Sequence, residues 1–406
     1  MRTLVIAGDY PWPADTGSRL RLTMILEGLL RCGPTELLSV VSKFRSDFGA
    51  PDETLGLAKV ERLGFDNRQA SGVGLLAALG RTSVPIGLPL GDRPRVQAEV
   101  ARFMTGRYDL VWYFGARSWV LAGEPSTGPT VVDLIDLEDQ KIKARLSEPP
   151  PPTAGPVARA RRVGATLVSE EETRRWQRLH RRAGTGPSTV VVCSQLDAAR
   201  ATASGVEHVA VIPNGYPVPG HPVGRDTVGS PPTVLFPGLL TYPPNAEAAR
   251  LLAGEVGPAL SALLPGVEIR GVGEHGSKLD DIHDPPSVTV TGRVPDIRAE
   301  LARADLVVVP LRYGSGTRLK ILEAFAQRIP VVSTSLGAEG LGAVDGVHLL
   351  VADSVTELAG ACYRLLTDED LRATVVSRAQ AYVLEQFDSS VVEAQVAELA
   401  RTLAGR

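Results

Sequence analysis

Short apolar runs, each followed by a stretch compatible with a helix, recur along the whole chain. Runs such as TLVIAG at 3–8 and DLVVVP at 305–310 have no alternating polar positions. Strands of this kind are buried on both faces, which is typical of parallel strands in a doubly wound sheet. Helices predicted at 245–264 and 317–327 would connect such strands, so the pattern predicts βαβ units and the α/β class. Similar runs occupy 109–114, 130–135, 189–194, 233–238, 267–273, 287–292 and 329–334.

The chain has 406 residues, which is more than one ordinary hydrophobic core holds, so its length predicts two domains. A strand at 209–212 runs into Pro213-Asn214-Gly215, and a polar, proline-rich stretch follows it up to Pro232. A second series of strands begins after this stretch. We therefore divide the chain into an N-terminal domain at 1–214, a C-terminal domain at 215–384 and a final helical segment at 385–406.

Charge and cysteine usage narrow the class of protein. The net charge of −3 argues against a nucleic-acid partner. The three cysteines lie far apart without CxxC or Cys/His spacing, so neither a disulfide framework nor a zinc site is indicated, which fits a reducing cytoplasm. The first residues lack the features of a signal peptide, and no apolar run reaches the 18 residues of a membrane span. These features predict a cytoplasmic protein without a transmembrane segment.

Four consecutive prolines within 147–156 predict an exposed loop. The basic segment 158–182 follows it and is compatible with a helix. We interpret this segment as a solvated helix face. A face for a membrane surface or an acidic partner is the less favoured alternative.

The strongest chemical signal is the run at 305–341, in which a strand, a glycine-containing turn and a helix follow one another. This arrangement directs backbone N–H groups at an anion. Gly314 and Gly316 let the backbone approach a phosphate without a Cβ in the way. Arg318 and Lys320 place positive charge in the first helical turn, where the helix dipole disfavours it, so they indicate a bound anion. Glu323 lies one turn further on, where a carboxylate accepts hydrogen bonds from ribose hydroxyls. An ordinary connection with exposed charges is the alternative.

This run resembles the nucleotide-sugar motif of family four of the retaining glycosyltransferases, the glycosyl transferases group 1. Glu323 matches the second glutamate of the motif, and Ile329-Pro330-Val331-Val332 matches the strand after it. The resemblance extends over most of the chain. Its other segments are PWPADTGSRLRL at 11–22, VVVCSQLDAARA at 190–201, VIPNGYPVP at 211–219, FPGLLTYPPNAEAARLL at 236–252 and GRVPDIRAELARADLVVVP at 292–310.

The resemblance implies a GT-B fold, in which two facing Rossmann-like domains enclose a cleft. It implies that the C-terminal domain holds a UDP- or GDP-linked sugar, that the N-terminal domain holds the acceptor, and that the final helix crosses back to the N-terminal domain. It further implies transfer with retention of configuration, in which the departing phosphate deprotonates the acceptor. The protein then mainly stabilises the diphosphate charge, and no metal or other cofactor is expected.

The resemblance also implies which residues contact the donor. Arg318 and Lys320 would stabilise the leaving diphosphate and are therefore also assigned a catalytic role. His275 is equally well explained as a solvated loop residue. The expected donor contacts are Gly17, Ser18, Gly238, His275, Lys278, Arg293, Val294, Gly314, Ser315, Gly316, Thr317, Arg318, Lys320, Leu322 and Glu323.

In the N-terminal domain, Asp133, Asp136 and Glu138 cluster at the C-terminal end of the run TVVDLI at 130–135, where α/β proteins place ligand contacts. They are candidates for orienting acceptor hydroxyls or for acting as a base, and capping the next helix is the alternative. Arg117 stands where many family members carry a histidine, so it is a further catalytic candidate. Arg19 and Arg21 are interpreted as charges on a helix surface.

The sequence departs from the family pattern at two further places. Ser315 occupies the position of the first glutamate, which usually contacts the donor sugar. The usual arginine and lysine are missing from 239–250, and Arg318 and Lys320 are candidates to replace them.

The GxGxxG pattern at 271–276 follows a predicted strand, as in dinucleotide-binding sites. The HDPP sequence at 283–286 would end any following helix early, so this pattern is rejected as an NAD site.

Three functions remain open for this sequence. We favour a glycosyltransferase with a small-molecule acceptor, such as a natural product, and a lipid-linked or cell-envelope saccharide is the alternative acceptor. A sugar-nucleotide epimerase and a non-catalytic nucleotide-sugar-binding protein are the alternative functions.

Overall fold

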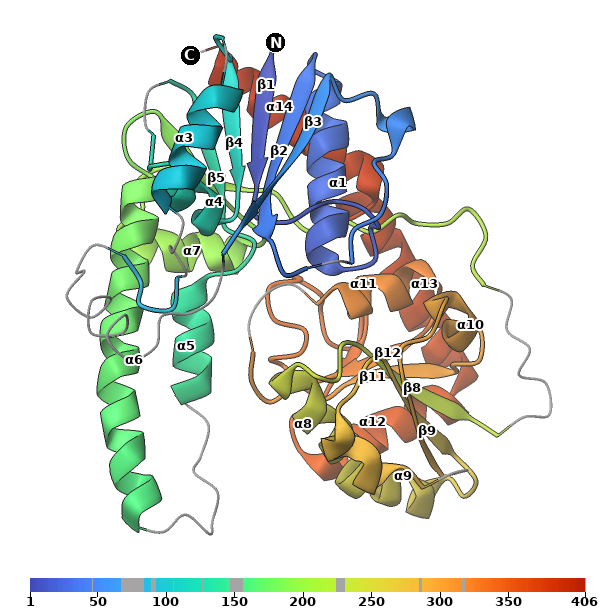
Figure 1. Ribbon diagram of the computed structural model, residues 1–406. Coiled ribbons are helices and arrows are strands. Elements are labelled where there is room, and N and C mark those ends of the chain that lie inside the picture. Colours follow the sequence, from blue (N-terminus) through green and yellow to red (C-terminus); the bar gives the residue numbers. More distant parts are fainter. Residues whose placement is uncertain are drawn as a thin grey trace. The chain divides into compact units, whose positions relative to one another are not determined.

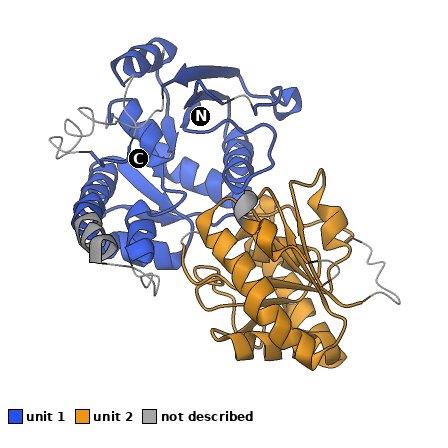
Figure 2. Ribbon diagram, turned by 60° about the horizontal axis from the view of Figure 1, so that its bottom comes forward, with its two compact units in different colours: residues 1–214, 392–406 blue, residues 215–391 orange. Residues whose placement is uncertain are grey.

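The chain forms two compact units, which Figure 2 distinguishes by colour. Unit 1 comprises Met1–Asn214 together with Val392–Arg406, and unit 2 comprises Gly215–Val391. The computed structural model describes residues 1–45, 47–66, 84–88, 93–104, 106–125, 128–146, 156–223, 231–284, 287–314 and 318–405, without the side chains of 156–165 and 277–278.

The described part of unit 1 contains a parallel sheet in the order β3-β2-β1-β4-β5-β6-β7. Every residue of its four central strands β1, β4, β5 and β6 is buried apart from Val111. Burial on both faces is the property expected of the continuous apolar runs. The strands are β1 Thr3–Ala7, β2 Thr35–Ser42, β3 Lys59–Phe65, β4 Leu110–Phe114, β5 Thr130–Asp133, β6 Ser188–Val192 and β7 Val209–Val211.

Helices cover both faces of this sheet (Figure 1). Alternate residues of β1 show the division, because Leu4 and Ile6 pack with α3, α4, α6 and α7, whereas Val5 and Ala7 pack with α1 and α14. The helices are α1 Gly17–Leu30, α3 Arg93–Phe103, α4 Ala116–Leu121, α5 Glu138–Leu146, α6 Pro156–Ala183, α7 Gln195–Ala203 and α14 Ser389–Ala404, with a 3₁₀ turn at Glu53–Leu55.

Helix α14 returns from the end of the chain to pack on α1. Val392, Val396 and Leu403 are buried in the same cluster as the apolar face of α1. Gly28 allows this close packing, since a Cβ there would lie 2.7 Å from the carbonyl oxygen of Glu393. The helix predicted around 385–403 begins later than expected, at Ser389, because α13 ends at Gln386 and a short break follows it.

Unit 2 contains a second parallel sheet over the described residues, in the order β10-β9-β8-β11-β12-β13. A continuous cluster of buried side chains surrounds it. The α/β class with two doubly wound parallel sheets is thus confirmed. The strands are β8 Thr233–Pro237, β9 Glu268–Val272, β10 Val288–Thr291, β11 Leu306–Val309, β12 Val331–Ser333 and β13 Leu350–Val351.

The helix predicted at 245–264 is divided into three parts. It begins earlier, at Pro243, where proline suits the first helical turn, and a π-helical turn at Leu252–Val256 interrupts it. In its next part Pro258 lacks the N–H that a regular ladder needs at this point. The helices of unit 2 are α8 Pro243–Leu251, α9 Gly257–Leu263, α10 Ile297–Leu301, α11 Leu319–Ala326, α12 Val355–Thr367 and α13 Glu369–Gln386, with a 3₁₀ turn at Ser277–Ile282.

A search of the described residues for membrane spans finds no helix that combines the required length with the required hydropathy.

Candidate functional site

Two cationic side chains lie together at the start of α11 in unit 2. Arg318 precedes the helix and is 9% exposed. The apolar face of α11 packs into the core through Ile321, Leu322 and Phe325, which directs Lys320 toward β8. The Nζ atom of Lys320 donates to Asn245 Oδ1 at 3.0 Å and lies 4.2 Å from the centre of the Phe236 ring.

The surroundings of Lys320 disfavour its own positive charge. Burial and the neighbouring Arg318 cation lower the pKa of the Lys320 ammonium to about 7, and Glu323 opposes this effect. Two part-buried cations in one place repel each other because the interior screens charge poorly. A bound polyanion would relieve this repulsion and would raise the pKa of Lys320 again. The geometry therefore suits a diphosphate better than a neutral ligand.

Glycines keep the space around these cations open. A Cβ at Gly238 would lie 2.8 Å from Lys320 Nζ, and a Cβ at Gly314 would lie 3.2 Å from Arg318 Nη2. Gly273 has a different role, since its Cβ would lie 1.8 Å from the carbonyl oxygen of Gly238. This close packing of two backbones explains the glycine in the GxGxxG pattern without a dinucleotide.

Glu323 faces Tyr216, which sequence reasoning missed. The Tyr216 hydroxyl donates to Glu323 Oε1 at 2.7 Å, and among the described residues Oε2 receives no hydrogen bond. Burial raises the pKa of Glu323, while the Tyr216 hydrogen bond and Lys320 lower it. A held carboxylate with one acceptor oxygen available fits the predicted contact to ribose hydroxyls, and this contact stays a prediction.

We expect Glu323→Gln to weaken nucleoside diphosphate binding roughly 10- to 100-fold. The substitution keeps the shape but replaces an acceptor oxygen with an amide, and a hydrogen bond to a charged group contributes about 1.5–3 kcal/mol. Calorimetric titration measures the change. Tyr216→Phe is the matched control, because it removes the hydrogen bond to Glu323 and leaves the carboxylate in place. It should therefore weaken nucleotide binding less than Glu323→Gln. Wild-type affinity in Glu323→Gln would contradict the assignment.

The other residues predicted to contact the donor lie in different surroundings. Ser315, Gly316 and Thr317, and the side chain of Lys278, lie outside the described residues. Leu322 is wholly buried in the core, so its side chain cannot contact a ligand in this arrangement. Arg293 is exposed, Val294 packs against the core of unit 2, and His275 Nδ1 lies 3.6 Å from Asp280 Oδ1 on the same loop.

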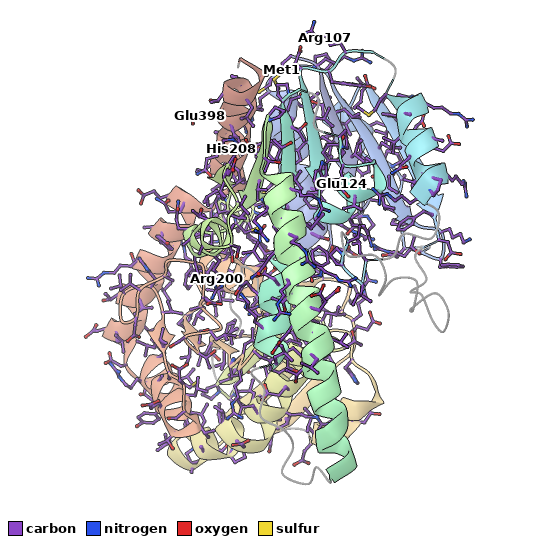
Figure 3. All side chains as sticks on the ribbon, turned by 90° about the vertical axis from the view of Figure 1, so that its left-hand side faces the viewer. Met1, Arg107, Glu124, Arg200, His208 and Glu398 are labelled. Atoms are coloured by element: carbon purple, nitrogen blue, oxygen red, sulfur yellow. The ribbon has the colours of Figure 1, made fainter. Side chains whose placement is uncertain are left out.

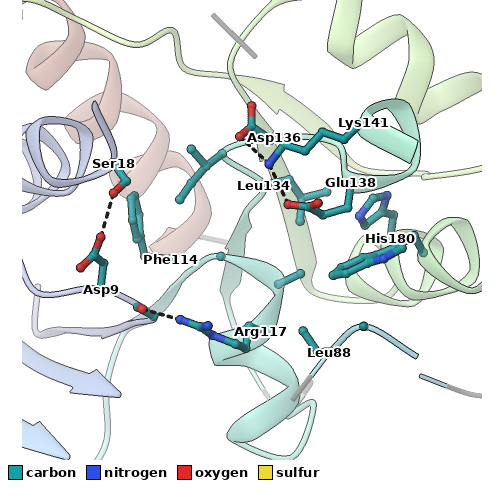
Figure 4. A pocket seen from close by; sticks show the side chains of 16 residues that line it. Asp9, Ser18, Leu88, Phe114, Arg117, Leu134, Asp136, Glu138, Lys141 and His180 are labelled. Carbon is teal, nitrogen blue, oxygen red and sulfur yellow. Dashed lines mark hydrogen bonds and ion pairs between the residues drawn. The ribbon is translucent and has the colours of Figure 1, made fainter. Parts of the chain in front are cut away.

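A separate pocket of about 440 Å³ lies in unit 1 (Figure 4). Gly8 and Asp9 follow β1, Gly115 follows β4, and Asp136 follows β5, so the pocket opens at the carboxyl ends of these strands. Parallel α/β sheets bind ligands at this edge. Helices α1, α4, α5 and α6 supply the rest of its wall.

The pocket contains an acidic pair bridged by a lysine. Lys141 Nζ lies 2.8 Å from both Asp136 Oδ2 and Glu138 Oε1. Burial lowers the pKa of the Lys141 ammonium, but the two carboxylates raise this pKa by more. The ammonium therefore stays charged. Asp136 therefore lines a pocket at the end of β5, and its predicted contact with an acceptor stays a prediction.

Two more predicted residues line the same pocket. Arg117 lies in α4 and donates from Nη2 to the carbonyl oxygen of Gly8 at 2.7 Å. Ser18 donates its hydroxyl to Asp9 Oδ2 at 2.8 Å. Gly17 begins α1 beside Ser18 but does not line the pocket. Figure 4 shows Arg117 and Ser18 on either side of Asp9.

Asp133 does not take part in this pocket, which corrects the predicted role. It is 0% exposed, and both of its oxygens accept hydrogen bonds from Arg21 at 2.9–3.2 Å. Burial raises the pKa of Asp133, and Arg21 opposes this effect. A carboxylate enclosed in this way can neither orient an acceptor hydroxyl nor act as a base, so Asp133 is structural.

The interpretation of Arg19 and Arg21 as surface charges is also wrong. Arg19 is 1% exposed and pairs with Asp15 and Asp47. Arg21 donates through Nη1 to the carbonyl oxygens of Ile212 and Pro213 and to Asn214 Oδ1. Arg21 thus holds the end of β7 against α1 and β5.

Part of α6 forms the pocket wall, so the solvated face predicted for 158–182 is wrong for that part. Trp176 and His180 line the pocket one helical turn apart, and Glu172 accepts hydrogen bonds from the backbone of Ile86 and Gly87. Near the end of α6, Arg182 Nε donates to Glu124 Oε2 at 3.1 Å. Figure 3 labels Glu124 beside this end of the helix. A charged sequence pattern concealed this packing, because some charged side chains of α6 are buried, such as Arg175, which is 3% exposed and pairs with Glu171.

Residues 231–368 match the family model for glycosyl transferases group 1. The matched segment lies within unit 2 and includes helix α11. Arg318, Lys320 and Glu323 lie within the matched segment. Tyr216 precedes this segment in the same unit. The resemblance predicted from the motif at 305–341 is thereby confirmed.

Two curated relatives of this chain are named as sugar transferases. A phosphatidyl-myo-inositol mannosyltransferase of Mycolicibacterium smegmatis is 31% identical over 182 residues, which is 43% of this chain and 46% of that protein. A putative teichuronic acid biosynthesis glycosyltransferase, TuaC of Bacillus subtilis, is 34% identical over 105 residues, which is 25% of this chain and 26% of that protein. The chain thus matches less than half the length of these relatives.

Solved structures match the whole chain. HepE of Anabaena, crystallised with UDP and glucose, has a TM-score of 0.66 at 20% identity, with 98% of each chain covered. Sucrose-phosphate synthase of Thermosynechococcus elongatus has a TM-score of 0.71 at 17% identity, with 100% of each chain covered. At these identities the matches establish the fold, so the expected GT-B architecture is confirmed.

Proposed function

We propose that this protein is a retaining glycosyltransferase that moves a sugar from a UDP- or GDP-linked donor to a hydroxyl acceptor. The observation that carries the proposal is the cation pair Arg318 and Lys320 at the head of α11, within the segment that matches the group 1 family model. Two similar proteins support this proposal, since one is named as a mannosyltransferase and the structure of HepE was solved with UDP and glucose.

Unit 2 would hold the nucleotide sugar through charge and backbone contacts. Glu323 accepts hydrogen bonds from the ribose, and Arg318 and Lys320 neutralise the diphosphate. As the bond between the sugar and the phosphate oxygen breaks, negative charge builds on the leaving diphosphate. The cations are in place before this charge develops, so they stabilise the transition state more than the bound donor.

The pocket of unit 1 would hold the acceptor. The departing phosphate takes the proton of the attacking hydroxyl, so the mechanism requires no dedicated protein base. This assignment agrees with the geometry, because Asp133 is enclosed by Arg21 and the Asp136 carboxylate is paired with Lys141. Retention of the anomeric configuration, the UDP- or GDP-linked donor and the hydroxyl acceptor all belong to what we propose.

The test is nucleotide release from several sugar nucleotides with and without acceptor mixtures. Release that depends on an acceptor supports the transferase. Conversion of the donor to an isomer without an acceptor would instead indicate an epimerase, and tight binding without turnover would indicate a non-catalytic binding protein.

We further expect turnover to continue at its untreated level after exhaustive chelation. Arg318, Lys320 and backbone amides supply the positive charge that a divalent cation provides elsewhere. Among the described residues, no group of three or more His, Cys, Asp or Glu side chains is arranged to hold a metal ion. Loss of activity that magnesium or manganese restores would contradict this expectation.

A further inference from the structure

His180 is a buried histidine with an unused nitrogen at the wall of the unit 1 pocket. Its ring is 2% exposed, and Nε2 has no hydrogen-bond partner among the described residues. A buried polar atom without a partner is costly, because its interaction with water is lost and not replaced, so native proteins rarely retain one without a use. Figure 4 shows the His180 side chain at the edge of the cavity, beyond Glu138.

The other nitrogen of His180 faces a carboxylate. Nδ1 lies 3.7 Å from Asp139 Oδ1, and Asp139 is itself held by Gln177, which donates to Oδ2 at 3.2 Å. A carboxylate at this position favours the proton on Nδ1 and leaves Nε2 as an acceptor. Burial lowers the pKa of His180 to about 4, opposed by Asp139, so the ring is neutral near pH 7.

The pocket around this acceptor combines an aromatic side chain with several polar groups. Trp176, one turn earlier on α6, lines the cavity beside His180, with 5.7 Å between their ring centres. Asp136, Glu138 and Lys141 provide further acceptors and a donor in the same cavity. An aromatic side chain packs against the C–H groups of a sugar or polyol ring, while the polar groups bind its hydroxyls.

We propose that the unit 1 pocket binds a saccharide or cyclic polyol acceptor, and that His180 Nε2 accepts a hydrogen bond from one of its hydroxyls. This inference rests on the proposed function and names the acceptor class. His180 positions the acceptor and takes no proton, since the leaving phosphate fulfils that role. An aromatic natural product without ring hydroxyls would leave Nε2 without a hydrogen-bond donor.

The test compares His180→Phe and His180→Gln with the wild-type chain saturated with UDP or GDP. Phenylalanine fills the space of imidazole without an acceptor, so stability should be unchanged or higher. Binding of methyl hexopyranosides and myo-inositol is measured by saturation-transfer difference NMR. We expect at least one of these probes to bind the wild type, about 10-fold or more weaker binding to His180→Phe, and partial recovery in His180→Gln, whose amide carries an acceptor.

Nucleotide binding separates the possible failures. If all chains bind UDP or GDP but none of these probes binds the wild type, the acceptor class is wrong and the transferase proposal stands. Equal probe binding by His180→Phe and the wild type would remove His180 from the site. If neither nucleotide binds the wild type, the proposed function itself fails, and this inference fails with it.

Discussion

Replacing Arg21 with methionine is expected to lower the free energy of unfolding of the protein by about 3–5 kcal/mol. The substitution leaves the Asp133 carboxylate fully buried without its cation and removes the hydrogen bonds to Ile212, Pro213 and Asn214. Methionine has a similar length, so the loss would come mainly from charge and hydrogen bonding. Unfolding in denaturant, followed by tryptophan fluorescence, measures the change, since Trp112 lies in the same unit as this pair.

The double variant Arg21→Met/Asp133→Leu should recover much of this loss, because it removes both charges together. Arg102→Met is the matched surface control. Its side chain is 75% exposed and pairs with Glu99, so the expected change is within about 0.5 kcal/mol. A loss below about 1 kcal/mol in the single variant Arg21→Met would contradict the structural role of the buried pair.

Arg318→Ala and Lys320→Ala are each expected to reduce kcat by roughly 10-fold or more at saturating donor. A contact that strengthens as the diphosphate leaves affects kcat and not only donor binding, and a charged hydrogen bond contributes about 1.5–3 kcal/mol. Removing Lys320 also removes a disfavoured charge, so thermal stability should be unchanged or higher. Steady-state kinetics together with thermal denaturation separates the two effects.

Arg318→Lys should recover only part of the activity, since an ammonium cannot make a two-pronged phosphate contact. Arg298→Ala serves as the control. The Arg298 side chain is 67% exposed and forms an ion pair with Asp296, two residues earlier in the chain. If both alanine variants at 318 and 320 keep the wild-type kcat, these side chains do not hold the leaving group.

The sheets were predictable because burial on both faces leaves a clear mark in the sequence. Runs such as 3–8 and 305–310 contain no polar alternation, and both form central parallel strands. The ends of helices were harder to place. The π-helical turn at 252–256 and the break after Gln386 depend on local backbone geometry, which an apolar pattern does not encode.

Buried charges were the main source of error. Arg21 could have been recognised, since Ile25 and Leu29 follow it at a spacing of four on the buried face of α1. Its partner Asp133 follows Val131 and Val132 of a buried strand, but 111 residues separate the two side chains in the sequence, so no local pattern joins them. Tertiary pairing alone decides whether such a charge is structural or catalytic.

The candidate donor site was predicted in outline and not in its supporting contacts. Glycines and cations around 314–320 indicated an anion, and the cations do lie together. Tyr216 and Asn245 were missed, because they come from segments distant in the sequence. Both segments resemble the family, but nothing in their sequence indicated that these two side chains form hydrogen bonds to residues of α11. His180 was hidden in a segment whose charges resemble a solvated helix.

The most direct measurement for the central claim is calorimetric titration of UDP and GDP at pH 8, in buffers with different ionisation enthalpies. The pKa of Lys320 is about 7 in the free protein, so at pH 8 the side chain is mostly neutral and must gain a proton when the diphosphate binds. We predict binding of at least one nucleotide with uptake of about 0.9 proton, and affinity that falls as the pH rises above 7. Lys320→Arg, which is always charged, should bind without this uptake. Absence of binding by both nucleotides, or the same proton uptake in Lys320→Arg, would contradict a diphosphate site at the start of α11.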